Sequence, residues 1–317
     1  MSNICGLNEM TEIRKTKNRQ KVLRRAGTSF REFEEKFPNQ KSCLDQIMKY
    51  RLREIFSCPK CGKIVGFKKI SKRNSYIAKC CTIRILSPLL QTPFYRSQIS
   101  LVVWFRIILY FTNASMGISP KFISNHFDLQ RRTAMRTCQL IRYHLLSIDN
   151  GICLGQNGRN VYVSETTIRS ISRRGRKNGV RYRILMATDG VEFLSIPITS
   201  GKLAKSRRLL LDRLYPNARI VIQTDELKKK ILNYYNSFKV KGHYIETTDD
   251  PYHQQFNELS VCVIALKRFI LQSHYWVSEQ HLDSYIGHFA FLYRRRHRGH
   301  EAFWDAVSNF PKFPKLS

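Results

Sequence analysis

Apolar side chains recur at helical spacing through the first half of the chain. Between residues 29 and 51 they return every three or four positions, which predicts short amphipathic helices separated at Pro38. The positions are Phe30, Phe33, Phe37, Cys43, Ile47 and Tyr50. A continuous apolar run from Leu101 to Phe111 contains Arg106. Crossing a bilayer takes about 20 apolar residues, so this run predicts a buried helix rather than a membrane span.

The second half of the chain has a different pattern, with short β-branched or aromatic runs separated by turn residues. These runs predict strands at Val161–Ile168, Tyr182–Ala187, Glu192–Ile198 and Ala218–Gln223. Helical spacing predicts helices at Ser206–Leu214, Phe256–Gln272 and Glu279–Arg296. The expected fold is therefore a mixed α/β domain at the C-terminal end of the chain.

The Gly- and Asn-rich segment Asp149–Asn160 is the best linker candidate. We expect a basic flexible arm at 1–27, N-terminal helices with a cysteine-containing ribbon at 28–92, a helical region at 93–148 and the α/β domain at 161–310. The arm is either a solvated tail or a segment for nuclear targeting or DNA-phosphate binding.

Charge changes the picture of the partner. The 317 residues contain 55 Lys and Arg against 23 Asp and Glu, a formal net charge of +32. With 43% hydrophobic residues the chain can still form a core, so the charge belongs to folded protein. A polyanion is the expected partner, and nucleic acid is favoured because Lys and Arg release the counterions of phosphates. We expect no membrane contact.

Nine cysteines, an odd number, argue against a disulfide framework and for a reducing compartment. The N-terminus lacks an apolar signal region, so secretion is not expected. Cys58 and Cys61 form a CPKCG knuckle that is typical of zinc binding, and Gly62 permits its tight turn. Cys80 and Cys81 follow at ribbon distance, although adjacent cysteines cannot easily both point at one ion. A structural Zn²⁺ held by these four residues is predicted, with a metal-free ribbon as the alternative.

The segment after the buried helix has helix-turn-helix spacing. An apolar helix from Pro120, a turn containing Leu129 and a second helix beginning with polar and basic residues fit this motif. The second helix would direct four side chains towards a DNA groove: Gln130, Arg131, Arg132 and Arg136. Any small helical bundle has similar spacing, and it is the +32 charge that favours DNA binding.

One carboxylate occupies a position suited to metal binding. Asp225 follows the predicted strand 218–223, and a carboxylate at a strand end can hold Mg²⁺ or cap the next helix. Two-metal chemistry needs another carboxylate on the first strand, where Ser164 stands in the equivalent position. Strand alternation places Glu165 on the opposite face. Two basic runs, 173–177 and 293–298, are either solvated or phosphate-binding, and the second includes Arg294 and Arg295.

In their order and spacing these pieces resemble the zinc-ribbon DDE transposases of bacterial insertion sequences and eukaryotic Merlin transposons. Besides the CPKCG ribbon, the matching segments are 33–38, 104–105 with 117–119, Val163–Thr166, Thr224–Glu226, His253–Glu258, Leu266–Arg268, 277–282, and 289–291 with 293–295. The resemblance implies a ribonuclease-H-like domain that cuts transposon ends and joins them to target DNA with two divalent metals, Mg²⁺ or Mn²⁺. It also implies DNA contacts by Lys267 and Arg268.

Carried over position by position, the second family aspartate is Asp225 and the first is replaced by Ser164. The third carboxylate is Glu258 if counted from His253, or Ser260 if counted back from Lys267. A hydroxyl cannot replace a bridging carboxylate, so the chain resembles a decayed or repurposed transposase.

Two functions remain as alternatives. In the first, Asp225 and Glu258 still hold metal, with Glu165 or Asp189 recruited. In the second, a domesticated non-catalytic protein binds DNA without cutting it, and RNA binding is kept as a third possibility because charge alone does not separate DNA from RNA. The expected partners are terminal repeats and target DNA, with a homodimer as a candidate assembly. The expected location is the nucleus in a eukaryote and the cytoplasm in a bacterium.

Overall fold

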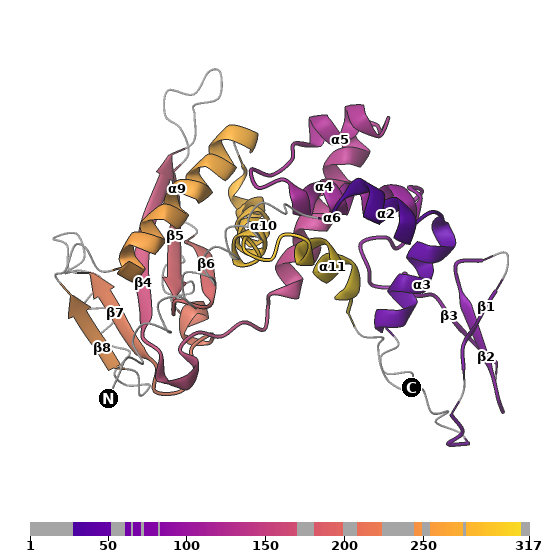
Figure 1. Cartoon of the computed structure of the whole chain (residues 1–317), viewed down its shortest axis with the longest axis horizontal. Helices are drawn as coiled ribbons and strands as arrows, with labels where there is room; N and C mark the ends of the chain where they lie inside the picture. The colour runs from indigo at the N-terminus through magenta and orange to yellow at the C-terminus, as the bar shows by residue number, and fades with distance from the viewer. Residues whose placement is uncertain are drawn as a thin grey trace, which may run out of the picture. The chain divides into compact units, whose positions relative to one another are not determined.

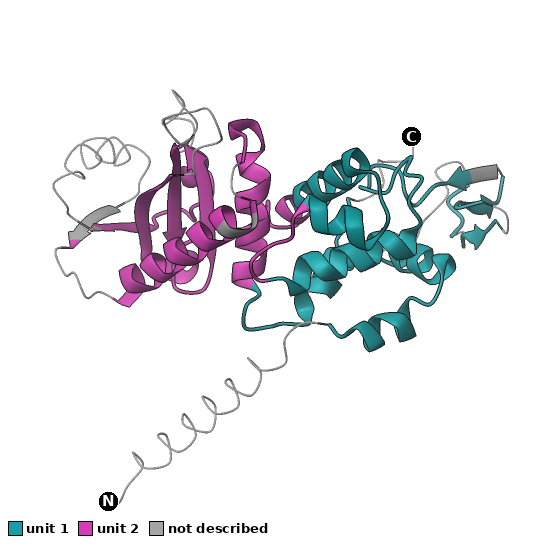
Figure 2. Ribbon diagram, turned by 90° about the horizontal axis from the view of Figure 1, so that it is seen from above, with its two compact units in different colours: residues 1–114, 120–144, 295–317 teal, residues 115–119, 145–294 magenta. Residues whose placement is uncertain are grey.

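The computed structural model describes residues 28–51, 61–64, 66–70, 73–81, 83–169, 181–198, 208–223, 244–248, 254–274 and 277–311 (Figure 1). The chain forms two compact units (Figure 2). Unit 1 comprises Met1–Ala114, Pro120–His144 and Arg295–Ser317, and unit 2 comprises Ser115–Ser119 and Leu145–Arg294. We had expected the C-terminal domain to continue to residue 310, whereas the segment after Arg294 belongs to unit 1.

Unit 1 is a helical bundle with an aromatic core. Its helices are α2 (Phe30–Lys36), α3 (Gln40–Arg51), α4 (Leu101–Asn113), α5 (Pro120–His126), α6 (Arg131–Ile148, of which the last four residues belong to unit 2) and α11 (Glu301–Ser308). The Ser29 and Ser100 hydroxyls cap α2 and α4 by accepting backbone N–H groups. Phe37 packs edge-to-face on Phe105, with ring centroids 5.0 Å apart, and Phe33 packs on Phe303 at 5.9 Å. The expected buried helix is therefore confirmed as α4.

Unit 1 also contains a small antiparallel sheet, with Cys80 and Cys81 between two of its strands. It has the order β1 (Lys68–Lys69), β2 (Tyr76–Lys79) and β3 (Ile83–Leu86). Tyr76 is buried, and its hydroxyl donates to Asp45 Oδ1 of α3 at 2.5 Å. Burial and this carboxylate both raise the pKa of Tyr76. The hydrogen bond attaches the sheet to the helical bundle.

Unit 2 is built on a five-stranded mixed sheet with the order β6-β5-β4-β7-β8. Its strands are β4 (Val161–Arg169), β5 (Arg181–Thr188), β6 (Phe193–Ile198), β7 (Arg219–Gln223) and β8 (Tyr244–Thr248). β4, β5 and β6 are antiparallel neighbours, while β7 runs parallel to β4 and β8 parallel to β7. The four predicted strands are confirmed, and β8 is an addition.

Strand alternation gives the sheet two apolar faces. One face packs against α9 (Gln254–His274) and α10 (Leu282–Arg294), through residues such as Tyr182, Met186 and Phe256. The other face packs against Leu154 and the segment 208–214 through Val163, Leu185 and Ile222. Short 3₁₀ turns lie at Gln156–Gly158 and Glu279–His281. Successive side chains of β4 therefore lie alternately on these two covered faces of the sheet.

The predicted α/β class is thus observed for unit 2. The predicted helix 256–272 corresponds to α9. The predicted helix 279–296 corresponds to the short turn 279–281 followed by α10. Of the predicted helix 206–214, residues 208–211 are helical. Among the described residues, no helix has the length and apolar character needed to cross a bilayer.

Candidate metal centre and nucleic-acid interface

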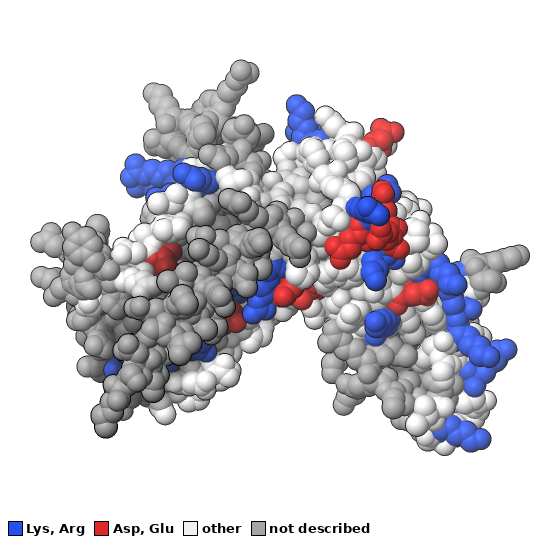
Figure 3. Space-filling view, in the orientation of Figure 1, with Lys and Arg blue, Asp and Glu red and all other residues white. Residues whose placement is uncertain are grey.

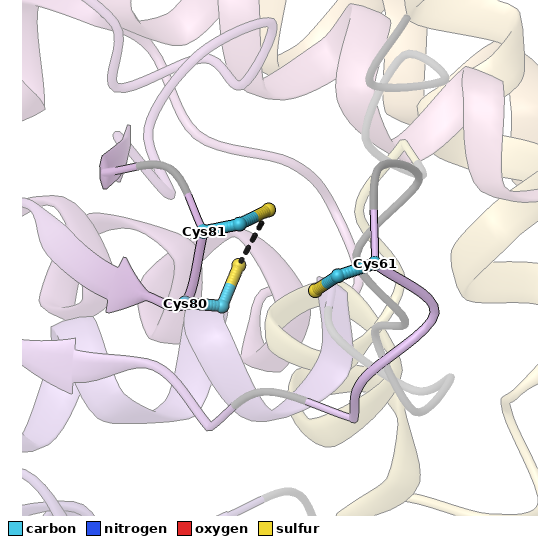
Figure 4. Close-up of side chains that lie close together, drawn as sticks. All are labelled: Cys61, Cys80 and Cys81. Carbon is cyan, nitrogen blue, oxygen red and sulfur yellow. Dashed lines mark hydrogen bonds between the residues drawn. The ribbon is translucent and has the colours of Figure 1, made fainter.

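Three cysteines converge at one end of the small sheet. The sulfur atoms of Cys61, Cys80 and Cys81 all lie within 4.8 Å of one another, and the three side chains are exposed (Figure 4). Cys80 and Cys81 occupy the turn between β2 and β3, and their Sγ atoms are 3.8 Å apart. Adjacent cysteines are not expected to point easily at one ion, but the sulfurs of both Cys80 and Cys81 lie within 4.8 Å of the Cys61 sulfur.

The separation of two of these sulfurs matches the ligand spacing of a tetrahedral thiolate site. A Zn–S bond of about 2.3 Å places two ligands of a tetrahedron about 3.8 Å apart. The Cys80–Cys81 separation of 3.8 Å has this length. Gly62 has a φ of 66°, the left-handed conformation that the knuckle turn was expected to need. Cys58, the remaining predicted ligand, lies outside the described residues.

The surroundings of the cysteines are strongly basic. No Asp or Glu occurs between residues 55 and 127, whereas cations recur along the ribbon. Figure 3 shows Lys and Arg side chains gathered over β1–β3, and Asp and Glu side chains gathered over α2. The described cations of the ribbon are Lys63, Lys68, Lys69, Arg73 and Lys79. This surface suits a polyanion.

Ser164 lies on the face of the sheet that α9 covers. Its neighbours on alternate positions, Tyr162 and Ile168, pack in the α9 cluster, and Tyr162 contacts Phe256 of α9 with ring centroids 5.5 Å apart. Val163 pairs with Ile222, so Ser164 lies close to the end of β7. Asp225, two positions after Gln223 in sequence, lies outside the described residues. The first family aspartate position is thus a half-buried hydroxyl.

Glu165 lies on the opposite face of the sheet, as alternation predicts. It stands opposite Leu185, a member of the second apolar cluster, and it forms an ion pair with Arg183 at 3.2 Å. The sheet therefore separates Glu165 from the side that carries Ser164 and α9. Glu165 therefore cannot take the place of the carboxylate that is missing at position 164 unless the strand register changes.

Asp189 has a structural role at the turn between β5 and β6. Its Oδ1 accepts the Val191 and Glu192 N–H groups at 3.1 and 2.8 Å, and its Oδ2 accepts the Gly155 N–H at 3.0 Å. Arg159 Nε lies 3.6 Å from Oδ2. Thr188 pairs with Tyr162, so this turn lies at the edge where β4 begins, away from the end of β7. These bonds already use the oxygens that a recruited metal ligand would need.

Both candidates for the third carboxylate position lie in the first two turns of α9. Glu258 is exposed, and the Ser260 hydroxyl donates to the Phe256 carbonyl at 3.0 Å. Neither belongs to the row that packs on the sheet, which is formed by Phe256, Leu259, Cys262 and Leu266. Within the described part of the chain, the three cysteines are the only group of three or more potential ligands brought together.

The helix-turn-helix segment has a well-defined turn between α5 and α6. The Leu129 N–H donates to the Ser124 carbonyl at 3.0 Å, and the Ser124 hydroxyl donates to the Leu129 carbonyl at 2.6 Å. Asp128 has a φ of 49°, a left-handed conformation that Asp tolerates better than most residues. Ile123 of α5 and Ala134 of α6 are fully buried. The two helices are thereby held in a fixed relation.

The four predicted DNA-contacting residues are all exposed on this segment: Gln130, Arg131, Arg132 and Arg136. Met135 and Tyr143 extend the same solvent-facing side of α6, with 54% and 42% of their surfaces exposed. Our reading of the sequence missed these two, although Arg132, Arg136 and Tyr143 follow the i, i+4, i+11 spacing of one helix face. No acidic residue occurs in the first turn of α6.

The remaining predicted contacts divide into two kinds. Lys267 and Arg268 are exposed on α9. Arg294 instead pairs with Asp149 at 2.8 Å, with both side chains at most 10% exposed, and Arg295 pairs with Asp305 at 2.7 Å. The expectation that Arg294 and Arg295 contact DNA is therefore revised, because both side chains are largely buried and paired with carboxylates. The basic run 173–177 lies outside the described residues.

Three of the cysteines outside the cluster are buried among apolar residues. Cys43, Cys138 and Cys262 are fully buried. Burial raises the pKa of the Cys43 thiol to about 12 and that of Cys138 to about 11, so both remain protonated and unreactive. Cys153 is half-buried, and Cys5 lies outside the described residues.

Comparison of the sequence with protein-family models and with curated proteins gives no match. The transposase resemblance is therefore a proposal about this chain.

Proposed function

We propose that this protein binds DNA in the manner of a zinc-ribbon DDE transposase and lacks a complete phosphoryl-transfer site. The observation that carries the proposal is the exposed basic side of α6. A well-defined turn holds the helix α6 itself against α5. An α-helix fits the major groove of B-DNA, and arginine side chains there contact base edges and phosphates. The acid-free, Lys-rich ribbon gives further support because it adds positive surface within the same unit.

The three-cysteine cluster is proposed to be a structural Zn²⁺ site. Cys61, Cys80 and Cys81 would supply three thiolates, with Cys58 as the fourth ligand. The metal would hold together a sheet whose strands have only two to four residues each. Sheets this short bury too little apolar surface to be stable alone, so a metal is a reasonable source of their stability.

The proposal that cutting is lost rests on Ser164. A ribonuclease-H-like site would need carboxylates on the α9 side of the sheet, beside the parallel pair β4 and β7. Support for such a domain comes from the mixed sheet and from α9 lying across β4 and β5 (Figure 1). At this place β4 offers a hydroxyl, while Glu165 faces away and Asp189 is bound to backbone. If Mg²⁺ or Mn²⁺ binds, Asp225 and Glu258 are the candidate ligands, and the bound metal would activate a nucleophile and stabilise phosphoryl charge.

Replacing Arg132 and Arg136 together with alanine should weaken binding to the element's terminal repeats. Each side chain that reads a base or a phosphate contributes about 1–3 kcal/mol, so the double variant should lose at least about tenfold in affinity. Fluorescence anisotropy over a range of salt concentrations measures this loss. Arg31→Ala provides the control, because Arg31 is exposed and pairs with Glu35 on the acidic helix α2. Unchanged affinity in the double variant would refute DNA binding through α6.

Restoring a carboxylate with Ser164→Asp tests the proposed loss of chemistry. We expect Mn²⁺ to bind the variant at least about tenfold more tightly than the wild-type chain, because an acidic oxygen ligand is added. Calorimetry measures the affinity, and nicking of terminal-repeat DNA reports any recovered activity. Ser164→Asn is the matched control, since it adds similar volume without charge. Metal-dependent nicking by the wild-type chain that Asp225→Asn abolishes would instead support the enzyme alternative.

The proposed partner is duplex DNA, with transposon terminal repeats and target DNA as its first candidates. A DNA-binding role would place a eukaryotic form of the protein in the nucleus and a bacterial form in the cytoplasm. A homodimer would allow two terminal repeats to be held at once.

A further inference from the structure

Two arginines lie directly opposite each other where β4 ends and β5 begins. The register pairs Arg169 of β4 with Arg181 of β5, and both residues are exposed. Directly opposed residues of an antiparallel pair have Cβ atoms about 4.5–5.5 Å apart. The two arginine side chains therefore extend from neighbouring positions on the same face of the sheet.

A third arginine lies on the same side of this strand pair. Residues two apart on a strand share a face, so Arg183 and Thr167 form the next cross-strand pair beside Arg169 and Arg181. Arg183 forms an ion pair with Glu165 at 3.2 Å. Neither Arg169 nor Arg181 forms an ion pair with another residue in the described part of the chain. The end of the strand pair thus carries more positive charge than its one carboxylate neutralises.

This arrangement works against the stability of the sheet. Like charges at directly opposed positions destabilise an antiparallel pair, whereas threonine, valine or an opposite charge would favour it. The residue before Arg169, Ile168, pairs with Tyr182 on the opposite face of the sheet, and both are buried in the core, at 1% and 2% exposed. The strands are therefore well anchored, and the opposed arginines are an exposed addition that folding does not require.

We propose that Arg169 and Arg181 form a binding site for the phosphodiester backbone of duplex DNA. The proposal rests on the DNA-binding function proposed above and adds a contact surface on unit 2. A two-stranded ribbon fits against a DNA groove, and guanidinium groups bind phosphate oxygens in a bidentate manner. A membrane surface is disfavoured, because binding there uses exposed apolar side chains as well as charge, and Ile168 is buried.

Arg181→Glu tests this site in a way that separates binding from folding. The new carboxylate stands opposite Arg169, so the melting temperature should be unchanged or higher. DNA affinity should nevertheless fall, and the slope of log K against log salt should become shallower by about 1 or more, since each neutralised phosphate contributes about 0.9. If Arg181 had only a structural role, the substitution would instead lower the melting temperature and the DNA affinity together.

Arg31→Glu is the matched control, because it makes the same charge change on an arginine whose side chain is 90% exposed. It should leave the salt slope unchanged. If Arg181→Glu lowers the melting temperature, Arg181→Thr replaces it as the test, with the same expected change in slope.

The outcomes distinguish this proposal from the one on which it rests. Wild-type chain that does not bind DNA overturns both. Loss of binding on changing Arg132 and Arg136, with an unchanged slope for Arg181→Glu and Arg181→Thr, overturns only the β4–β5 site. A loss of binding to anionic phospholipid vesicles, with DNA binding unaffected, would also overturn it in favour of a membrane contact.

Discussion

If the three cysteines hold the zinc proposed above, Cys61→Ser should abolish zinc binding and unfold the small sheet of unit 1. Two thiolates on one short turn cannot complete a tetrahedral site without the knuckle that faces them. Structural zinc contributes about 10–16 kcal/mol of apparent binding free energy in zinc-finger peptides, far more than β1–β3 could gain from packing. Metal analysis should fall from one zinc per chain to none, and hydrogen exchange of the β2 and β3 amides should become fast.

Cys153→Ser provides the control for that experiment. Cys153 is a half-buried cysteine of unit 2, remote in sequence from the cluster, so its replacement should leave the zinc content unchanged. Retention of a full equivalent of zinc by Cys61→Ser would show that the three sulfurs converge for another reason. Tyr76 provides a second measurement, because its hydrogen bond to Asp45 should be lost when the sheet unfolds.

Asp189→Ala should destabilise unit 2 by about 2–3 kcal/mol, because hydrogen bonds to a charged group contribute about 1.5–3 kcal/mol. The carboxylate is fully buried, and it accepts three backbone N–H groups beside Arg159. Removing it leaves three backbone N–H groups without this acceptor and opens the turn between β5 and β6. Chemical denaturation followed by circular dichroism measures the free energy of unfolding.

Glu165→Ala is the comparison for Asp189→Ala. Glu165 also pairs with an arginine, but the Arg183 side chain is 50% exposed, so the loss should be at most about 1 kcal/mol. If Asp189 were a recruited metal ligand, Mn²⁺ would stabilise the wild-type chain and not Asp189→Ala. Equal stability of Asp189→Ala and the wild-type chain would contradict the structural role.

The sequence predicted the central sheet well because both of its faces are apolar. β4 and β5 alternate between two clusters, so their apolar residues mark the strands to within one residue. β8 was missed because its sequence, YIETT, has few apolar residues and it lies at the sheet edge. Alternation also placed Glu165 correctly, since a side chain that follows a buried Val163 by two positions shares its face.

Long-range pairing was beyond the reach of sequence patterns. Arg294 and Arg295 appear in the sequence as part of a basic run, yet they form ion pairs with Asp149 and Asp305 and are at most 13% exposed. The direction of Cys80 and Cys81 depends on the turn between β2 and β3, which spacing alone did not reveal. Periodicity identifies which side of an element is buried, but not which distant residue lies against it.

The division of the chain into units has a consequence for how the protein is made. Unit 2 is complete once Arg294 has been synthesised, whereas unit 1 still needs α11, whose Phe303 and Ala306 are fully buried. The aromatic core of unit 1 therefore has to wait for α11 to leave the ribosome. Domains usually fold in the order of their synthesis, and here the unit that begins first would be finished last. During that interval the exposed aromatic side chains of α2 and α4 are natural targets for a chaperone.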